Sequence, residues 1–369
     1  MNHAKSTVAV CLLCSFLAVD AAAQSPFQGL EHLFTQPKSY PASFTARPPV
    51  IDGEVSDAAW ATVAWSSSFV DIEGDKKPSP RFDTRIKMLW NDTCLFIAAE
   101  LKEPHVWANL RKHDEVVFYD NDFEVFIDPD NNTHQYYEIE VNALNTIFDL
   151  FMPKPYRNGS GALIPYDTPG MKTAVKVHGT LNDPSDTDQG WTVEMRIPFR
   201  AISMGNGAQV PQPGAVWRIN FSRVEWDTGI IGGKYVKKKD GKGRTLPENN
   251  WVWSPQGVVN MHYPERWGYL QFVKPGTEPQ PFKFPHAELR KQYLWLVYYK
   301  QKAYFERAGK YAPTLTELGI SGEPQVENQL NRIMMETAGR QFNATITEDG
   351  GETWSINDEG LIQTGRTSK

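Results

Sequence analysis

Cysteine is almost absent from this chain, with three among 369 residues, and two of them lie in an N-terminal apolar run, Val8 to Val19. A lysine precedes the run and small residues, Ala21 to Ala23, follow it, which is the pattern of a secretory signal peptide. We therefore expect residues 1–23 to be removed on export, leaving Cys94 alone. An intramolecular disulfide is then excluded, and the apolar neighbours of Cys94 predict a small buried hydrophobe.

Other absences exclude further classes of protein. After the first apolar run, no stretch approaches the roughly 18 apolar residues of a membrane span, so no membrane span is expected after signal removal. The net charge is −6, and the one dense basic run, Lys234 to Arg244, is rich in glycine and predicts an exposed loop rather than a nucleic-acid surface. Phosphate-loop and dinucleotide motifs are missing, so no nucleotide cofactor is expected. The eight histidines show no metal spacing, and no haem is expected either.

Short alternating segments separated by turn residues fill the chain from about residue 40 to residue 273. In "GWTVEMRIPF" the pattern directs Trp191, Val193, Met195 and Ile197 to one face, and "TRIKMLW" and "AVWRINFSRVEW" alternate in the same way. Many short strands without intervening helices predict a mainly β protein, an antiparallel β-sandwich over 40–273.

A different pattern follows the sandwich. The segment 274–285, "KPGTEPQPFKFP", is expected to be a linker because of its prolines. Residues 286–369 then predict a C-terminal α+β extension. It begins with one long helix, which we expect to end at Gly309, and two or three short strands follow. This mostly helical extension could cover an edge of the sandwich or form a small appendage.

The stretch "DNDFEVFIDPDNNTHQYYEIEVNALNTIFD", Asp120 to Asp149, alternates like a hairpin and sets acidic groups on one face. Four explanations are open: a solvated face, a catalytic pair, a metal site or the floor of a sugar site. The acidic and amide residues of that face are Glu124, Asp128, Glu138, Glu140 and Asn142.

Several segments occur in one order: "PPVIDGEVSDAAW", "TRIKMLWNDTCLFIAAELKEP", the hairpin above, "GWTVEMRIPF" and the closing "RWGYLQF". This order resembles the family 9 carbohydrate-binding module and its DOMON-like relatives, over about residues 40–273. The resemblance implies a β-sandwich that binds sugars, in well-studied members between two aromatic side chains. It also implies structural calcium in some members.

The resemblance carries over residue by residue. Glu124 matches the family's glutamate in "E-x-F-I-D", and Phe118 stands where the family usually has a tryptophan. Glu140 falls on the family's arginine, which reverses the charge. The second stacking tryptophan has no counterpart, although His262 or Tyr263 could replace it.

A sugar site needs carboxylates and amides that bridge hydroxyls, and aromatic faces that stack on the ring. The residues expected to bind carbohydrate are Phe118, Tyr119, Glu124, Glu140, Asn142, Asn220, Trp226, Asn260, His262 and Tyr263. The alternative is a set of structural charges paired by Arg196 or Arg218, without a ligand. "DPDNN" offers Asp128, Asp130 and Asn132 to a calcium ion, although an ordinary turn explains it equally well.

The function expected is non-catalytic binding of an oligo- or polysaccharide, in support of polysaccharide catabolism. The protein would be exported to the periplasm, the medium or the cell surface. No catalytic residue is predicted. One alternative is a glycoside hydrolase-associated or weakly hydrolytic protein acting on O-glycosyl bonds, since glycosidases use two carboxylates. The other is a sandwich retained for structure or protein interaction.

Overall fold

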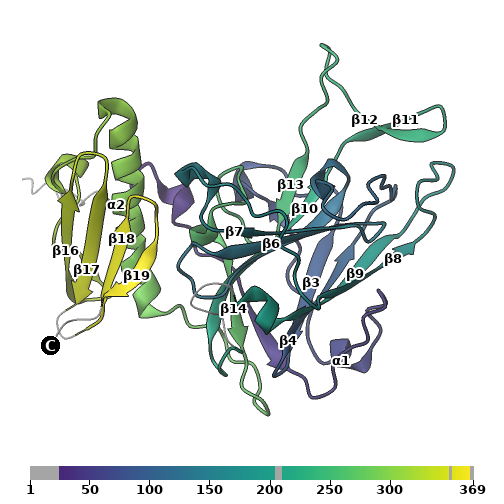
Figure 1. Cartoon of the computed structure of the whole chain (residues 1–369), viewed down its shortest axis with the longest axis horizontal. Coiled ribbons are helices and arrows are strands. Elements are labelled where there is room, and N and C mark those ends of the chain that lie inside the picture. The colour runs from purple at the N-terminus through teal and green to yellow at the C-terminus, as the bar shows by residue number, and fades with distance from the viewer. Residues whose placement is uncertain (1–24, 204–209, 349–350, 366–369) are drawn as a thin grey trace, which may run out of the picture.

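A computed structural model describes residues 25–203, 210–348 and 351–365, and it contains a large β-sandwich beside a smaller α+β unit (Figure 1). Among these residues the sandwich has twelve hydrogen-bonded strands. They are β1 (Ser39–Phe44), β2 (Val70–Asp71), β3 (Thr84–Trp90), β4 (Cys94–Leu101), β5 (Asp122–Asp128), β6 (Tyr136–Asn142), β7 (Ile147–Met152), β8 (Lys172–His178), β9 (Gly190–Pro198), β10 (Val216–Glu225), β13 (Asn249–Val252) and β14 (Gly268–Phe272).

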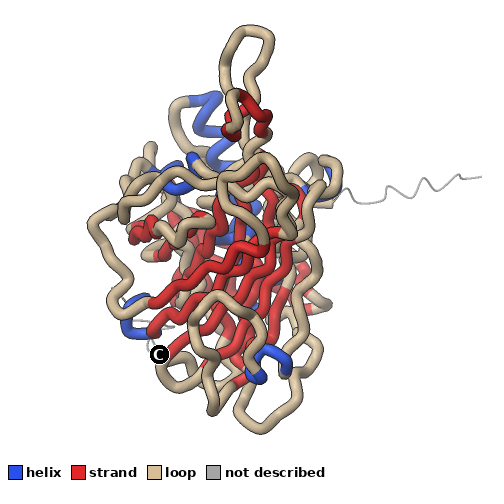
Figure 2. Tube along the Cα trace, turned by 90° about the vertical axis from the view of Figure 1, so that its right-hand side faces the viewer, coloured by secondary structure: helices blue, strands red, loops and turns tan. Residues whose placement is uncertain are grey.

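The strands form two layers that are joined through β1. One layer has the order β7-β6-β5-β10-β14-β1 and the other β1-β3-β4-β9-β8. Figure 2 shows strands running diagonally side by side, with loops gathered beyond their ends. The predicted antiparallel sandwich is confirmed except at β1, which pairs in parallel with both β14 and β3. A sequence pattern could not show this, because β1 lies between strands that are distant from it in the chain.

The core lies between the two layers, as the alternation predicted. In β9 the side chains of Trp191, Val193, Met195 and Ile197 are all buried there. They face the buried row of β5, which is formed by Phe123, Val125 and Ile127. Cys94 is free and buried, as predicted.

Two shorter features accompany the sandwich. The helix α1 (Ala58–Ala61) places Trp60 in a small core of its own outside β3 and β4. The strands β11 (Thr228–Ile231) and β12 (Lys234–Lys237) pair as a hairpin that projects from the body (Figure 1). The segment predicted as an exposed basic loop is therefore exposed, but it starts as a strand.

The C-terminal unit consists of one long helix on an antiparallel sheet. The helix α2 (His286–Ala308) ends at Gly309, whose φ of +69° and N–H bond to Phe305 form the predicted C-cap. Five strands follow in sequential order within the described residues, more than the two or three predicted. They are β15 (Gln325–Val326), β16 (Gln329–Thr337), β17 (Phe342–Glu348), β18 (Thr353–Asn357) and β19 (Ile362–Gly365).

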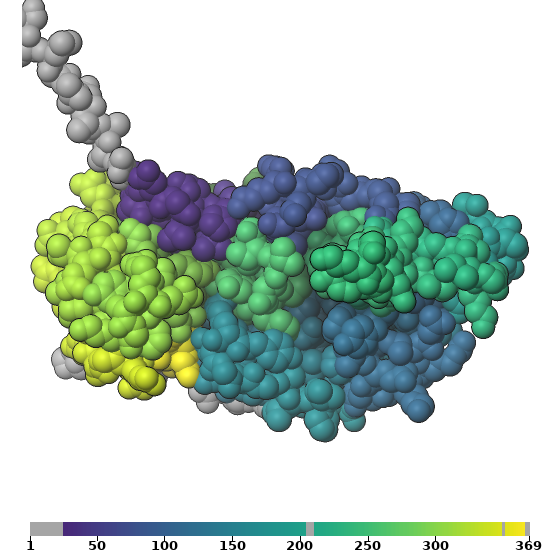
Figure 3. All heavy atoms as spheres, turned by 90° about the horizontal axis from the view of Figure 1, so that it is seen from above, coloured from purple at the N-terminus to yellow at the C-terminus, as the bar shows by residue number. Residues whose placement is uncertain are grey.

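The N-terminal segment joins the two bodies, a contact that the sequence did not predict. Phe27 lies 5.3 Å from Tyr293 of α2 and Phe34 lies 6.0 Å from Tyr299, measured between ring centroids. The space-filling view shows this segment, in purple, along the boundary between the units (Figure 3). The extension is therefore packed against the sandwich. The predicted domain limits, 40–273 and 286–369, stay a prediction and leave this segment out.

No helix within the described part of the chain has both the length and the apolarity of a membrane span. The predicted signal peptide, residues 1–23, lies outside the described residues.

Candidate functional site

The acidic face of the predicted hairpin lies on the outer surface of the sheet, away from the core. Glu124 of β5 is directly opposite Glu140 of β6, and on its other side it is opposite Ser222 of β10. Side chains that are directly opposite across antiparallel strands point to the same face. The register thus aligns two carboxylates and a hydroxyl in one row.

Two more carboxylates, Asp122 and Glu138, lie on the same face in the rows on either side. All four acids are almost completely buried, with exposed fractions between 0% and 5%. Loops and segments around η3 (Val117–Tyr119) and around Met261 pack over this face. The interpretation of this acidic face as a solvent-exposed surface is therefore wrong.

Burial makes this face unfavourable for negative charge. It raises the pKa of Glu124 to about 7, and the nearby Ser222 hydroxyl only partly opposes the shift. Burial also raises the pKa values of Asp122, Glu138 and Glu140 well above their ordinary range, and repulsion among the neighbouring carboxylates adds to this. The acids act electrostatically as one group.

Several polar atoms of the face have no hydrogen-bond partner within the described residues. They are Asp122 Oδ2, Glu124 Oε2, Glu138 Oε2 and Ser222 Oγ. Glu140 Oε2 does accept the N–H of Phe118 at 2.9 Å, and Asp122 Oδ1 accepts that of Val224 at 3.2 Å. Buried polar groups nearly always find partners, so unpaired atoms in one place need an explanation.

The arginines suggested as structural partners do not neutralise these acids. Arg218 pairs with Glu288 of α2 at 2.7 Å, and Arg196 donates to the carbonyl of Gly170. Arg218 lies near the start of β10, at one end of the outer-facing residues of that strand. From there its side chain reaches Glu288 of the C-terminal unit. The alternative of charges paired by Arg196 or Arg218 is therefore wrong.

Aromatic side chains lie beside the carboxylates. Phe118 and Tyr119 belong to η3, next to Glu140, and Tyr119 is 56% exposed. Tyr156, which is 44% exposed, meets the ring of His262 edge-on at 4.5 Å. Two partly exposed aromatic surfaces are thus available next to the buried acids.

His262 connects one of these surfaces to the sheet. Its Nδ1 lies 2.9 Å from the Tyr136 hydroxyl, and its Nε2 lies 3.8 Å from Glu138 Oε2. Burial, and then the charge of Arg157, lower the pKa of His262 to about 4. The imidazole is therefore neutral at pH 7 and adds no positive charge to the acidic face.

Three of the predicted sugar ligands have polar atoms that already form bonds within the fold. Asn142 bonds through its amide to Leu110 O and Asp120 Oδ2, and its oxygen accepts two backbone N–H groups. Asn220 holds the backbone of Ser254 through both ends of its amide. Trp226 is buried, and its indole N–H donates to Phe118 O at 2.8 Å. Their polar atoms are therefore already in use.

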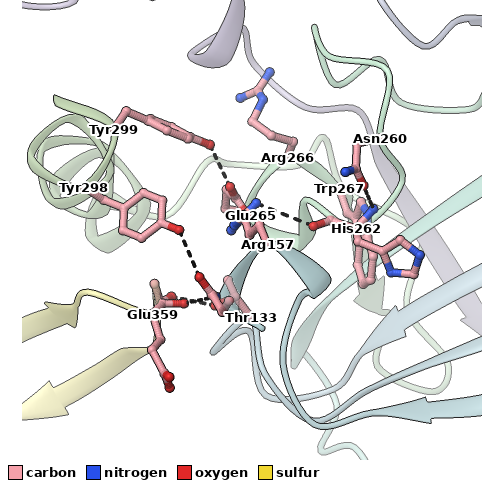
Figure 4. Close-up of polar contacts among 12 residues, drawn as sticks. Thr133, Arg157, Asn260, His262, Glu265, Arg266, Trp267, Tyr298, Tyr299 and Glu359 are labelled. Atoms are coloured by element: carbon pink, nitrogen blue, oxygen red, sulfur yellow. Dashed lines mark hydrogen bonds and ion pairs between the residues drawn. The ribbon is translucent and has the colours of Figure 1, made fainter. Parts of the chain in front are cut away.

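Asn260 and Tyr263 belong to the loop that carries His262, just before η6 (Pro264–Arg266). The oxygen of Asn260 accepts the N–H of His262 at 2.8 Å, and Arg157 lies over the Tyr263 ring at 4.3 Å. Arg157 in turn binds Glu265 at 2.9 Å, which accepts the Tyr299 hydroxyl at 2.6 Å (Figure 4). The loop that carries His262 is therefore held in place partly by α2.

The proposed calcium loop uses its own oxygens. Asp128 accepts the backbone N–H groups of Asp130, Asn131 and Thr133, and Asp130 accepts both the N–H and the amide of Asn132. These bonds organise a turn and present no converging set of free oxygens. The residues do not fit calcium in this arrangement, and binding there stays a prediction.

A histidine does meet three carboxylates, which the scattered histidines of the sequence did not predict. His113 Nε2 lies 2.9 Å from Asp167, and 3.4 Å from both Asp114 and Asp149. Burial opposes a charge on His113, but the hydrogen bond to Asp167 and the three carboxylates outweigh it and raise its pKa. The imidazolium itself supplies the positive charge of this cluster.

Four residues of the candidate site, three on the acidic face and one beside it, were not predicted as site residues. Asp122 and Ser222 were missed as site residues although both follow from the period of two, since they share a face with Glu124. Glu138 was placed on the face but not in the site. Tyr156 begins the short 3-10 helix η4 (Tyr156–Asn158) after β7, and no sequence signal could have placed it beside His262.

Residues 51–254, more than half of the chain, match the family described as "Carbohydrate family 9 binding domain-like". An endo-1,4-beta-xylanase A from Thermoanaerobacterium saccharolyticum is 27% identical over 159 residues, and an exoglucanase XynX from Acetivibrio thermocellus is 26% identical over 159 residues. Each match covers 43% of this chain, and the chain spans only 12% of either relative. A solved family 9 carbohydrate-binding module from Caldicellulosiruptor kristjanssonii, in complex with cellotriose, is 17% identical; the match covers 67% of this chain and 100% of the module, with a TM-score of 0.40.

Proposed function

The chain belongs to the carbohydrate family 9 binding domain-like family, and we propose that it binds an oligo- or polysaccharide without hydrolysing it. The observation that carries this proposal is the extent of the family match. It includes β5, β6 and β10, which hold the acidic face, and the segments of Tyr119 and Tyr156 beside it. The ligand site is therefore proposed within the matched part of the chain.

The chemistry of this surface suits a sugar. Tyr119 and Tyr156 offer exposed rings that can pack on the apolar face of a pyranose. Glu124 and Glu138 are each 5% exposed, so a hydroxyl that donates to a carboxylate can reach only the edge of the acidic face. Glu140 replaces an arginine that the resemblance implied, and recognition here would rely on acceptors more than on donors.

We also propose export and a supporting role in polysaccharide catabolism. The signal pattern in residues 1–23 supports transport to the periplasm, the medium or the cell surface. The two curated relatives bear the names of glycan-degrading enzymes, but the chain spans a small part of each. Their catalytic activity is accordingly not proposed for this protein.

The test is calorimetric titration of the protein lacking residues 1–23 with a panel of oligosaccharides, beside Tyr119→Ala and Tyr156→Ala. Loss of a stacking ring should weaken binding of the recognised sugar by about tenfold. Tyr304→Ala is the matched control, because that tyrosine lies on α2 and bonds to Glu317, away from the acidic face. If the folded protein binds no sugar of the panel, the result would favour a sandwich retained for structure or protein interaction. Release of reducing sugar would favour a hydrolase.

A further inference from the structure

We propose that Asp122, Glu124 and Glu140 bind one hard divalent cation on the outer face of the sheet, with the Ser222 hydroxyl as a further ligand. This site goes beyond sugar binding and does not depend on it. It also differs from the loop of Asp128, where a turn uses the available oxygens.

The three carboxylates converge by strand register. Asp122 and Glu124 are two residues apart on β5 and share its outer face, and Glu140 is directly opposite Glu124 on β6. One oxygen from each lies within 4.8 Å of the other two. Calcium binds oxygen at 2.3–2.6 Å, so ligands on opposite sides of one ion lie about 5 Å apart. The spacing is therefore within the reach of a single ion.

A second observation, on the neighbouring strand β10, points to the same place. Ser222 is completely buried, lies opposite Glu124 on β10, and its Oγ has no hydrogen-bond partner within the described residues. Asp122 Oδ2 and Glu124 Oε2 are unpaired as well. A buried hydroxyl and two carboxylate oxygens thus lack hydrogen-bond partners on one surface of the described chain, and a cation would satisfy all of them.

The charge balance distinguishes this group from the other acidic clusters. Among the described residues, no lysine, arginine or histidine forms an ion pair with Asp122, Glu124 or Glu140. His113 provides the cation of its own cluster. Three buried carboxylates without a base are strongly unfavourable, and either a metal ion or bound protons must compensate them. The unpaired hydroxyl and the convergence favour the ion.

The direct test is titration of the chelator-treated protein with CaCl₂ and MnCl₂ in a buffer without sugar. We expect one equivalent of ion to bind, and Asp122→Asn and Glu140→Gln to weaken it at least about thirtyfold. Asp130→Asn is the matched control and should stay within about twofold of the wild type. The proposal would be overturned if neither ion binds, or if Asp122→Asn and Glu140→Gln bind the ion as tightly as the wild type. Loss of binding in Asp130→Asn alone would also overturn it.

Thermal melting separates lost binding from lost folding. Glu140→Gln removes one of several mutually repelling carboxylates and keeps an oxygen for the N–H of Phe118. The chelated variant should therefore melt no lower than the chelated wild type. Calcium should raise the melting temperature of the wild type and leave that of Glu140→Gln unchanged, and an equal rise in both would contradict the site. A failed glycan titration would leave these results unaffected.

Discussion

Glu288 of α2 anchors the C-terminal unit to the sandwich, and its replacement by glutamine should cost measurable stability. Its carboxylate accepts bonds from Arg218 at 2.7 Å, Lys291 at 2.7 Å and the Tyr269 hydroxyl at 2.8 Å. Arg218 also lies 3.9 Å above the Tyr269 ring. All four side chains are buried, so removing the one anion leaves two buried cations without a partner.

The size of the effect follows from the pKa of Glu288. Burial alone would raise this pKa, but the charges of Lys291 and Arg218 outweigh burial and lower the pKa to about 2, against an ordinary value of 4.5. A lowered folded-state pKa stabilises the fold above the ordinary value, and the stabilisation is lost as the pH falls towards 2. It amounts to about 3 kcal/mol at pH 7 and about 1 kcal/mol at pH 3.

The assay is urea unfolding of the wild type and Glu288→Gln at both pH values, followed by tryptophan fluorescence. We expect the variant to lose about 3 kcal/mol at pH 7, since breaking a buried pair costs 3–5 kcal/mol, and the difference to shrink to about 1 kcal/mol at pH 3. The control Glu317→Gln changes an exposed acid on the same unit and should cost under about 0.5 kcal/mol. A loss below about 1 kcal/mol at pH 7, or a loss independent of pH, would refute the reasoning.

Three further predictions concern single side chains that are buried or partly buried, each measured by urea unfolding. Phe34→Ala should destabilise the C-terminal unit by about 2 kcal/mol, because the ring packs on α2, and an unchanged midpoint would refute the docking role. Glu194→Ala should cost about 3 kcal/mol, since its carboxylate accepts the Trp60 indole N–H and two backbone N–H groups; a neutral result would contradict this. Arg223→Met should cost about 3–5 kcal/mol by leaving Glu103 buried without its cation and Glu225 with only Arg81 at 3.5 Å, and equal stability would show that Glu103 is protonated.

The fold could be predicted in its repetitive parts. Alternation alone placed Trp191, Val193, Met195 and Ile197 in the core, because a period of two leaves one face of a strand buried. The same rule put Glu124 and Glu140 on one face of the sheet, but it could not predict whether that face is buried or exposed. The parallel pairing of β1 and the packing of Phe27 and Phe34 on α2 could not be predicted, because both depend on contacts between segments distant in sequence.

The candidate site could be predicted less completely than the fold. Glu124 and Glu140 are directly opposite each other, and His262 lies 3.8 Å from Glu138 on the same face; their role in binding stays a prediction. Asn142 and Asn220 stay predictions as sugar ligands, but their amides already complete turns and strand ends, and amide chemistry alone does not distinguish a structural bond from a ligand bond. Composition likewise cannot tell that a row of acids is covered by loops.

Hydrogen–deuterium exchange is the most direct test of the central claim, that the outer face of the sheet and its aromatic neighbours bind carbohydrate. The protein is compared with and without a saturating concentration of the oligosaccharide that binds best in the glycan panel. The account predicts slower exchange in residues 115–124 and 154–158, which carry Tyr119 and Tyr156, and little change in 286–348. Protection confined to the C-terminal unit, or none on a saturated protein, would contradict it.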